Sequence, residues 1–251
     1  MRKKVKQNAI VLRQLIQTSR QSAVLLLEML YGVFLTLSAL LLFLKIHDEV
    51  LENEFMNFDM FILRLLHSWH TPILNGVMIV ISALGHQLLL TAAILISIFL
   101  LRKHHKREAF LMFFIIGMTF LINISIKNLV QRPRPQYFPL YTLTDKSFPS
   151  GHSMESFVFY STIGYFIFHF TKRKYFSLFI AVVCLIIIGL VGLSRVYLGV
   201  HYPSDVIAGY FGGLAWFSSV LLIEKTLAFY KLFLEHKQKH AVLRVHSSVR
   251  G

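Results

Sequence analysis

Two short polar segments of this chain hold side chains that suit acid–base and nucleophilic chemistry. One runs from residue 127 to 153 and the other from 194 to 205, and apolar stretches flank both. Together they supply three cations, two histidines and a carboxylate. These residues are Lys127, Arg134, His152, Arg195, His201 and Asp205. Guanidinium forks match phosphate oxygens in pairs and a lysine adds a point charge, so the three cations favour a bound phosphate.

Each segment leads into an expected helix. Ser150 and Gly151 stand just ahead of one, where free backbone N–H groups and the helix dipole attract an anion, and glycine lets the backbone approach it closely. Pro203 is typical of a first helical position. His201 then precedes that helix and Asp205 lies in its first turn. A carboxylate there can hold the histidine ring in one tautomer.

The two histidines can divide the work of phosphoryl transfer. One is neutral and attacks phosphorus, while the other is protonated and donates to the leaving oxygen. A covalent phosphohistidine results, and water then hydrolyses it. Charge on the non-bridging oxygens would be balanced by the three cations and by loop amides. We therefore expect no metal ion and no other cofactor.

The spacing of these residues resembles the three signature motifs of the type 2 phosphatidic acid phosphatase family. The motifs are Lys127-x6-Arg134-Pro135, Pro149-Ser150-Gly151-His152 and Ser194-Arg195-x5-His201-x3-Asp205, in the family's order. The resemblance implies that His201 is the nucleophile, Asp205 its orienting partner and His152 the general acid. It also implies a set of phosphate-binding residues. These are Lys127, Arg134, Ser150, Gly151 and Arg195.

Composition indicates a membrane protein. The 251 residues are 55% hydrophobic and 15% charged, with a mean hydropathy of +0.61, which is unusual for a soluble domain. Six apolar runs approach the length needed to cross the hydrocarbon core. They are Ala23–Ile46, Gln87–Leu101, Ala109–Ile126, Phe157–Phe170, Tyr175–Leu193 and Val206–Ile223. We expect an all-α integral membrane protein, a six-transmembrane-helix bundle with its active site at the non-cytoplasmic ends of helices 3–6.

The distribution of basic residues predicts the topology. Most of the 26 Lys and Arg residues lie near the N-terminus, at 102–107, at 172–174 and after Glu224. The positive-inside rule places these clusters and both termini in the cytoplasm, so the site faces outside. This holds only if the stretch from residue 72 to 101 crosses once, and we therefore expect an interfacial or partly inserted helix at Pro72–Leu84.

The chain is accordingly divided into three parts. Residues 1–22 are expected to form a basic cytoplasmic segment and residues 225–251 a basic cytoplasmic tail. Residues 23–224 form the phosphatase domain, which includes an outer amphipathic insertion at 48–85. The formal net charge of +14 does not indicate nucleic acid, because the basic residues flank the spans, where anionic lipid headgroups explain them. The expected partners are membrane lipids and a lipid phosphate or pyrophosphate substrate. Nothing in the sequence indicates a protein partner or an oligomeric state.

The family includes bacterial phosphatidylglycerophosphate phosphatases and undecaprenyl pyrophosphate phosphatases, as well as vanadate haloperoxidases. The leading expected substrate is undecaprenyl pyrophosphate, at the outer face of the bacterial cytoplasmic membrane. Phosphatidylglycerophosphate and phosphatidic acid are the alternatives. A non-catalytic lipid transporter is a remoter one, since a transporter would place its polar site near the bilayer midplane. A silent lipid-binding scaffold is not favoured, because both histidines are present.

Several polar residues lie outside the three motifs. Arg132 is expected to contact a headgroup or solvent. Glu155 either helps to select substrate or orient His152, or complements a helix dipole. His86 has no acidic or cationic motif around it, and the role of residues 48–85 stays open. Gly209 and Gly213 have the small-residue spacing that brings helices together.

Overall fold

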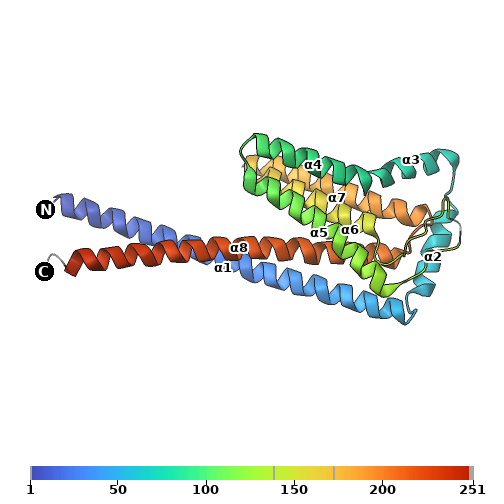
Figure 1. Ribbon diagram of the computed structural model, residues 1–251, viewed down its shortest axis with the longest axis horizontal. Helices are drawn as coiled ribbons and strands as arrows, with labels where there is room; N and C mark the ends of the chain where they lie inside the picture. The colour runs from blue at the N-terminus through green and yellow to red at the C-terminus, as the bar shows by residue number, and fades with distance from the viewer. Residues whose placement is uncertain (1, 138, 172, 249–251) are drawn as a thin grey trace. The chain divides into compact units, whose positions relative to one another are not determined.

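Helices form nearly all of the regular structure. The computed structural model describes residues 2–137, 139–171 and 173–248, and the side chains of 22–86, 88–137, 139–171 and 173–234. In these ranges there is no β-strand, which confirms the expected all-α class. The helices are α1 (Arg2–Leu51), α2 (Met56–His67), α3 (Pro72–Ala83), α4 (Gln87–Arg102), α5 (Lys106–Val130), α6 (Gly151–Thr171), α7 (Lys174–Tyr197) and α8 (Pro203–Ser248) (Figure 1).

Five segments among the described residues are long and apolar enough to cross a membrane. They are Ser22–Leu51, Pro72–Arg102, Lys106–Val130, Lys174–Tyr197 and Pro203–Leu234. The fourth expected run forms α6, which is not in this group. This helix packs against both α5 and α7, and its buried positions include Ser153, Glu155, Ser156 and Thr162. Its hydropathy is therefore lowered by polar side chains that face protein.

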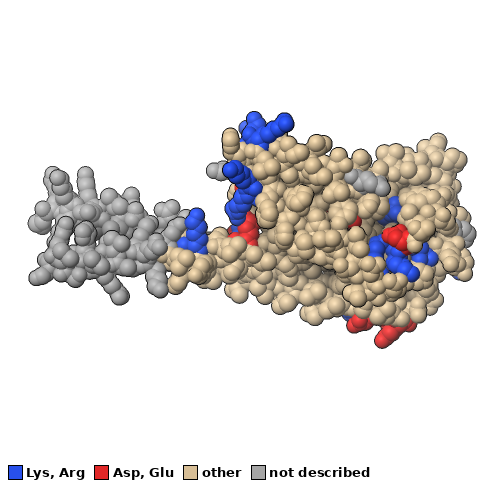
Figure 2. All heavy atoms as spheres, viewed as in Figure 1, with Lys and Arg blue, Asp and Glu red and all other residues tan. Residues whose placement is uncertain are grey.

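The surfaces of α4, α5 and α7 are rich in exposed apolar side chains. More than half of the surface of Phe99, Phe113, Phe179 and Leu185 is exposed. Figure 2 shows a broad uncharged surface over α4 and α5, with charged side chains gathered at both ends of these helices, including the end where the α5–α6 loop lies. An exposed apolar surface of this extent is suited to lipid tails. The protein is an integral membrane protein.

Residues 72–102 are divided between two helices. The Thr71 side chain caps α3 by accepting a hydrogen bond from the Leu74 N–H at 3.2 Å, and Pro72 occupies the first helical position. Helix α3 ends before Leu84, and α4 begins at Gln87. The expected helix at Pro72–Leu84 is thus present as a separate element.

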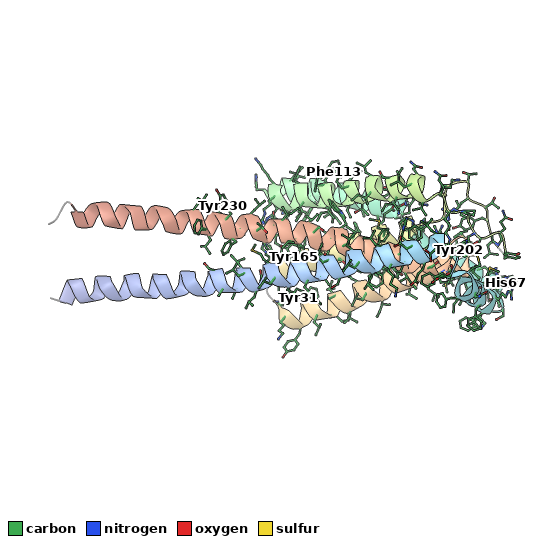
Figure 3. All side chains as sticks on the ribbon, turned by 90° about the horizontal axis from the view of Figure 1, so that it is seen from below. Tyr31, His67, Phe113, Tyr165, Tyr202 and Tyr230 are labelled. Atoms are coloured by element: carbon green, nitrogen blue, oxygen red, sulfur yellow. The ribbon has the colours of Figure 1, made fainter. Side chains whose placement is uncertain are left out.

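Helices α2 and α3 lie at the same end of the α4–α7 bundle as the α5–α6 loop and the α7–α8 turn (Figure 1). Leu63 of α2 shares a buried apolar cluster with Tyr202, and Figure 3 shows Tyr202 beside the helix that carries His67. On α7, the Tyr197 hydroxyl donates to Asn75 Oδ1 of α3 at 2.7 Å. The outer insertion is therefore packed onto the helices that lead into the second polar segment.

Of the described residues, 2–36 and 218–248 form a compact unit of their own. In this unit Lys225 pairs with Glu28 at 2.8 Å, and Thr36 donates to the Ser218 hydroxyl at 2.9 Å. The expected basic segments are residues 1–22 and 225–251, and the side chains of 1–21 and 235–251 lie outside the described residues.

Two glycines allow α8 to approach the first turns of α6. A Cβ atom at Gly209 would lie 2.7 Å from the Ser150 carbonyl oxygen, and one at Gly213 would lie 3.1 Å from the Met154 carbonyl oxygen. The first distance is too short for any side chain without a shift of the backbone. The expected role of these glycines in helix packing is confirmed.

We expect Gly209→Ala to destabilise the protein by about 1–3 kcal/mol, because the added methyl group must separate α8 from α6. Gly164→Ala is the matched control, since a Cβ atom at Gly164, within α6, would meet no other atom within 4 Å, and alanine favours a helix interior. The midpoint of heat-induced aggregation in detergent should fall for the first variant only. Equal midpoints for the two variants would contradict this account.

Candidate active site

A pocket of about 510 Å³ opens between α3, α5, α6 and the two polar loops. Six of the eight residues singled out from the sequence line it. They are Lys127, Arg134, Gly151, His152, Arg195 and His201. The other two, Ser150 and Asp205, are completely buried and do not line the pocket. Folding thus brings the two polar segments to one place, as the sequence predicted.

His201 lies in the wall of this pocket with 1% of its surface exposed. Its Nε2 atom is 3.0 Å from Arg134 Nη1. An arginine can only donate, so Nε2 is the unprotonated nitrogen and the ring proton is on Nδ1. Nδ1 lies 3.5 Å from Asp205 Oδ2. The ring therefore has the tautomer that places its lone pair on Nε2, where it accepts the hydrogen bond from Arg134.

The charge state of His201 agrees with this tautomer. Burial lowers its pKa well below the usual value, and the positive charges of Arg134, Arg195 and Lys127 lower it further. The imidazole is therefore neutral in the absence of an anion. A neutral imidazole is nucleophilic, whereas an imidazolium is not.

Asp205 is fixed by several donors at the start of α8. One carboxylate oxygen accepts from the Tyr202 N–H at 2.9 Å and from the Ser147 hydroxyl, and the other accepts from Arg132 Nη1 at 2.6 Å. The Asp205 carbonyl also accepts from the Ser150 N–H at 3.0 Å. These contacts hold the first turn of α8 against the segment that carries His152.

Arg132 is a buried residue, and the sequence-based expectation of headgroup or solvent contact is wrong. Its side chain is 9% exposed and lies between two buried carboxylates, with Nη1 bound to Asp205 and Nη2 bound to Asp59 at 2.8 Å. Its guanidinium carbon also lies 4.2 Å from the centre of the Tyr202 ring. Arg132 is drawn inward because Asp59, which is distant in sequence, supplies a second negative charge.

Asp59 joins α2 to this network. Its carboxylate accepts from the Ser204 N–H at 2.9 Å and from the Ser204 hydroxyl at 2.6 Å. Burial raises the pKa of Asp59, while the bonds from Ser204 and Arg132 oppose that rise. The outer insertion thus supports Asp205 through Arg132 and Ser204.

Lys127 and Arg134 share a third carboxylate in the α5–α6 loop. Lys127 Nζ donates to Asp145 Oδ2 at 2.6 Å, and Arg134 Nη2 donates to Asp145 Oδ1 at 2.7 Å. Arg134 also donates through Nη1 to the Val200 carbonyl at 2.6 Å. The two cations are therefore held close together, beside His201.

Arg195 is the third cation, and it is 2% exposed. Its Nη1 atom donates to the Ser82 hydroxyl at 2.5 Å and to the Tyr141 hydroxyl at 2.6 Å. Its Nε atom has no hydrogen-bond partner among the described residues. A buried donor of this kind is suited to an oxyanion.

His152 and His86 lie side by side in the pocket wall. The two rings stack with centroids 4.9 Å apart and an interplanar angle of 21°. His86 Nδ1 lies 2.5 Å from Glu155 Oε2, and the Glu155 side chain is 3% exposed. Glu155 therefore contacts His86, and His86 in turn stacks on His152. The sequence did not indicate this indirect contact.

Gly151 leaves no room for a side chain. A Cβ atom there would lie 3.0 Å from Asn123 Oδ1 and 3.2 Å from Glu155 Oε1. Behind it, the Ser150 hydroxyl accepts a hydrogen bond from the Ser153 hydroxyl at 3.0 Å. Gly151 thus allows the backbone itself to form part of the pocket wall.

Comparisons with known proteins show which family has this arrangement of residues. The model of the PAP2 superfamily matches residues 108–228. Phosphatidylglycerophosphatase B of Bacillus subtilis (strain 168) is 34% identical over 184 residues, which cover 72% of this chain and 90% of that protein. The chain belongs to the PAP2 superfamily. This confirms the family that the three motifs indicated.

Two further PAP2 comparisons extend the similarity. The crystal structure of a transmembrane PAP2 type phosphatidylglycerolphosphate phosphatase from Bacillus subtilis superimposes with a TM-score of 0.73 and 31% identity, covering 77% of this chain and 97% of that one. The undecaprenyl-diphosphatase of Sulfolobus acidocaldarius is 30% identical, covering 71% of this chain and 84% of that protein. The chain is therefore a PAP2-family lipid phosphatase, a phosphoric ester hydrolase. These relatives differ in the substrates that they are named for.

Sequence reasoning missed four residues that surround the PAP2 motif residues. They are Asp59, Ser82, His86 and Asp145. Asp145 had the clearest signal, because it is an acid in the loop between two motif segments. The other three belong to the outer insertion or its junction with α4, and no motif there indicates what they contact.

Proposed function

We propose that this PAP2 enzyme removes phosphate from a lipid phosphomonoester or pyrophosphate through a phosphohistidine intermediate. The observation that carries the proposal is the geometry of His201. Its Nδ1 atom faces Asp205, and its Nε2 atom faces Arg134 in the pocket that also holds Lys127 and Arg195. A nucleophile, its orienting carboxylate and the cations for a phosphate are thus adjacent.

In the first step, the Nε2 lone pair of His201 attacks phosphorus. The bond between phosphorus and the leaving oxygen breaks, and His152 gives that oxygen a proton. Asp205 stabilises the positive charge that develops on the His201 ring. Lys127, Arg134 and Arg195 balance the charge on the non-bridging oxygens, together with the backbone amide of Gly151. Ser150, which the sequence assigned to the phosphate, is instead completely buried, and its N–H donates to the Asp205 carbonyl.

In the second step, water attacks the phosphorus atom of the phosphohistidine. The neutral His152 accepts a proton from this water as the P–N bond breaks, and the bonding electron pair returns to Nε2 of His201. Inorganic phosphate is then released. Each histidine regains its starting state, so the cycle needs no other reactant.

The leading substrate that we propose is undecaprenyl pyrophosphate. The support is a site expected at the outer face of the bacterial cytoplasmic membrane, with both termini in the cytoplasm, where the basic clusters follow the positive-inside rule. In this topology α6 is a sixth span and residues 48–85 are an outer insertion. The second candidate is phosphatidylglycerophosphate, and the observation that favours it is the high coverage of the Bacillus subtilis relatives.

The test is phosphate release by the detergent-purified protein from undecaprenyl pyrophosphate, phosphatidylglycerophosphate and phosphatidic acid. We expect turnover that persists in EDTA, because three cations of the protein balance the phosphate charge. We also expect inhibition by orthovanadate, whose trigonal-bipyramidal adduct with His201 would resemble the transition state.

The outcomes separate the alternatives. A strong preference among the three lipids names the substrate, and comparable rates indicate a broad lipid phosphatase. Activity that is lost in EDTA and restored by a metal ion would overturn the mechanism. Absence of phosphate release from every lipid would favour a transporter or a lipid-binding scaffold.

A further inference from the structure

The Asp145 carboxylate occupies the two cations that the proposed mechanism assigns to the substrate phosphate. One of its oxygens binds Lys127 at 2.6 Å and the other binds Arg134 at 2.7 Å. Paired oxygens that bridge a lysine and an arginine are the contacts that a phosphate would make with the same groups. Asp145 itself lines the pocket.

The exposure of the three side chains differs. Lys127 and Arg134 are 11% and 10% exposed, whereas Asp145 is 56% exposed. The cations therefore belong to the pocket wall, and the carboxylate reaches them from its open side.

Asp145 is ionised at neutral pH. Burial alone would favour its neutral form, but the hydrogen bonds and positive charges of Lys127 and Arg134 lower its pKa to about 2. The carboxylate thus carries a full charge where the phosphate is expected.

The loop does not depend on the carboxylate for its position. The Asp145 carbonyl accepts from Arg134 Nε at 2.9 Å, and the Lys146 carbonyl accepts from Lys127 at 2.6 Å. Further along, the Ser147 N–H donates to the Arg132 carbonyl at 2.9 Å. With the backbone held by these bonds, the Asp145 side chain can leave the cations by rotation about its own bonds.

We propose that Asp145 is an internal competitor for the phosphate site, bound to Lys127 and Arg134 in the free enzyme and displaced when a phosphate binds. The proposal rests on the proposed function, because it requires these two cations to be the phosphate site. Substrate binding is then an exchange of one anion for another. Return of the carboxylate to the cations favours release of inorganic phosphate at the end of each cycle.

A competitor of this kind has a quantitative signature. It weakens the binding of every anion that needs the same two cations, and it does so by one common factor, whatever the shape of that anion. A carboxylate that instead holds the cations in their working geometry has the opposite effect, because its loss weakens anion binding. The two roles therefore differ in the sign of the change.

The experiment measures inhibition constants for orthophosphate and orthovanadate in the full-length protein and in Asp145→Asn and Asp145→Ala. The assay uses whichever of the three lipids is turned over fastest. Both inhibition constants and the KM should fall about fivefold, the size expected from two partly exposed ion pairs. The kcat should stay the same or fall, because product release becomes slower.

Asp48→Asn is the matched control. Asp48 is a carboxylate with a 72% exposed side chain, and it does not line the pocket. This substitution removes the same charge without touching Lys127 or Arg134, and all constants should remain at the wild-type values. A fall in this control equal to that in the Asp145 variants would mean that net charge is responsible, and would overturn the proposal.

The other outcomes are also decisive. Unchanged or raised inhibition constants in both Asp145 variants would overturn the internal competitor while leaving the phosphatase proposal intact. Inhibition constants for orthophosphate and orthovanadate that change by clearly different factors would also overturn the internal competitor and leave the phosphatase proposal intact. If the wild-type protein releases no phosphate from any of the three lipids, the proposed function fails, and this inference fails with it.

Discussion

His201→Ala is expected to lower the rate of phosphate release by about three orders of magnitude or more, because it removes the proposed nucleophile. His152→Ala should cause a comparable loss with a lipid substrate, since the leaving oxygen then departs unprotonated. A substrate with an acidic leaving group, such as p-nitrophenyl phosphate, should distinguish the two variants. We expect partial recovery of its cleavage by His152→Ala and none by His201→Ala.

Rapid-mixing measurements with the same substrate extend this test. In His152→Ala, the first step should outpace water attack, so a burst of p-nitrophenol should precede slow turnover. His169→Ala is the control, because His169 is exposed near the opposite end of α6 from His152. Substantial turnover by His201→Ala would exclude a phosphohistidine at this position.

Arg132→Met is expected to destabilise the protein by about 3–5 kcal/mol, because it leaves Asp59 and Asp205 buried without their shared cation. The measurement is the thermal midpoint of the purified protein in detergent. Arg64→Met is the control, since Arg64 of α2 is exposed. The double variant Asp59→Asn/Arg132→Met should recover part of the loss, because one of the two uncompensated charges is then removed.

Activity gives a second measure of the same network. Arg132→Met should lower kcat even at temperatures at which the variant is still folded, because Asp205 loses the donor that fixes one of its oxygens. Wild-type stability and kcat in this variant would show that the buried ion pairs contribute nothing. A loss of equal size in Arg64→Met would show that the effect is general.

The helices could largely be predicted from the sequence because an apolar run is a local signal. The Ala109–Ile126 run, for example, lies within α5, and Pro203 marks the start of α8 as expected. Helix α6 is the exception to this rule. Helix α6 is enclosed by its neighbours and carries part of the site, so its composition falls short of the apolar character that identifies the other candidate spans.

The candidate site was predictable only where a motif gives its spacing. Lys127, Arg134 and His201 meet in one pocket as expected, but the partners of Arg132 did not follow from the motifs. Asp59 and Arg132 are 73 positions apart, and their contact depends on how α2 packs against the turn before α8. No local pattern contains that information, and the inward direction of Arg132 was therefore missed.

The hydrogen bonds of Asp59 have a consequence for how the enzyme matures. Asp59 belongs to the outer insertion, and through Arg132 and the Ser204 N–H it supports the turn that presents Asp205 to His201. A newly made chain whose insertion has not yet docked lacks that support. We therefore expect phosphatase activity to depend on docking of the outer insertion, although Asp59 itself is not among the residues that line the pocket.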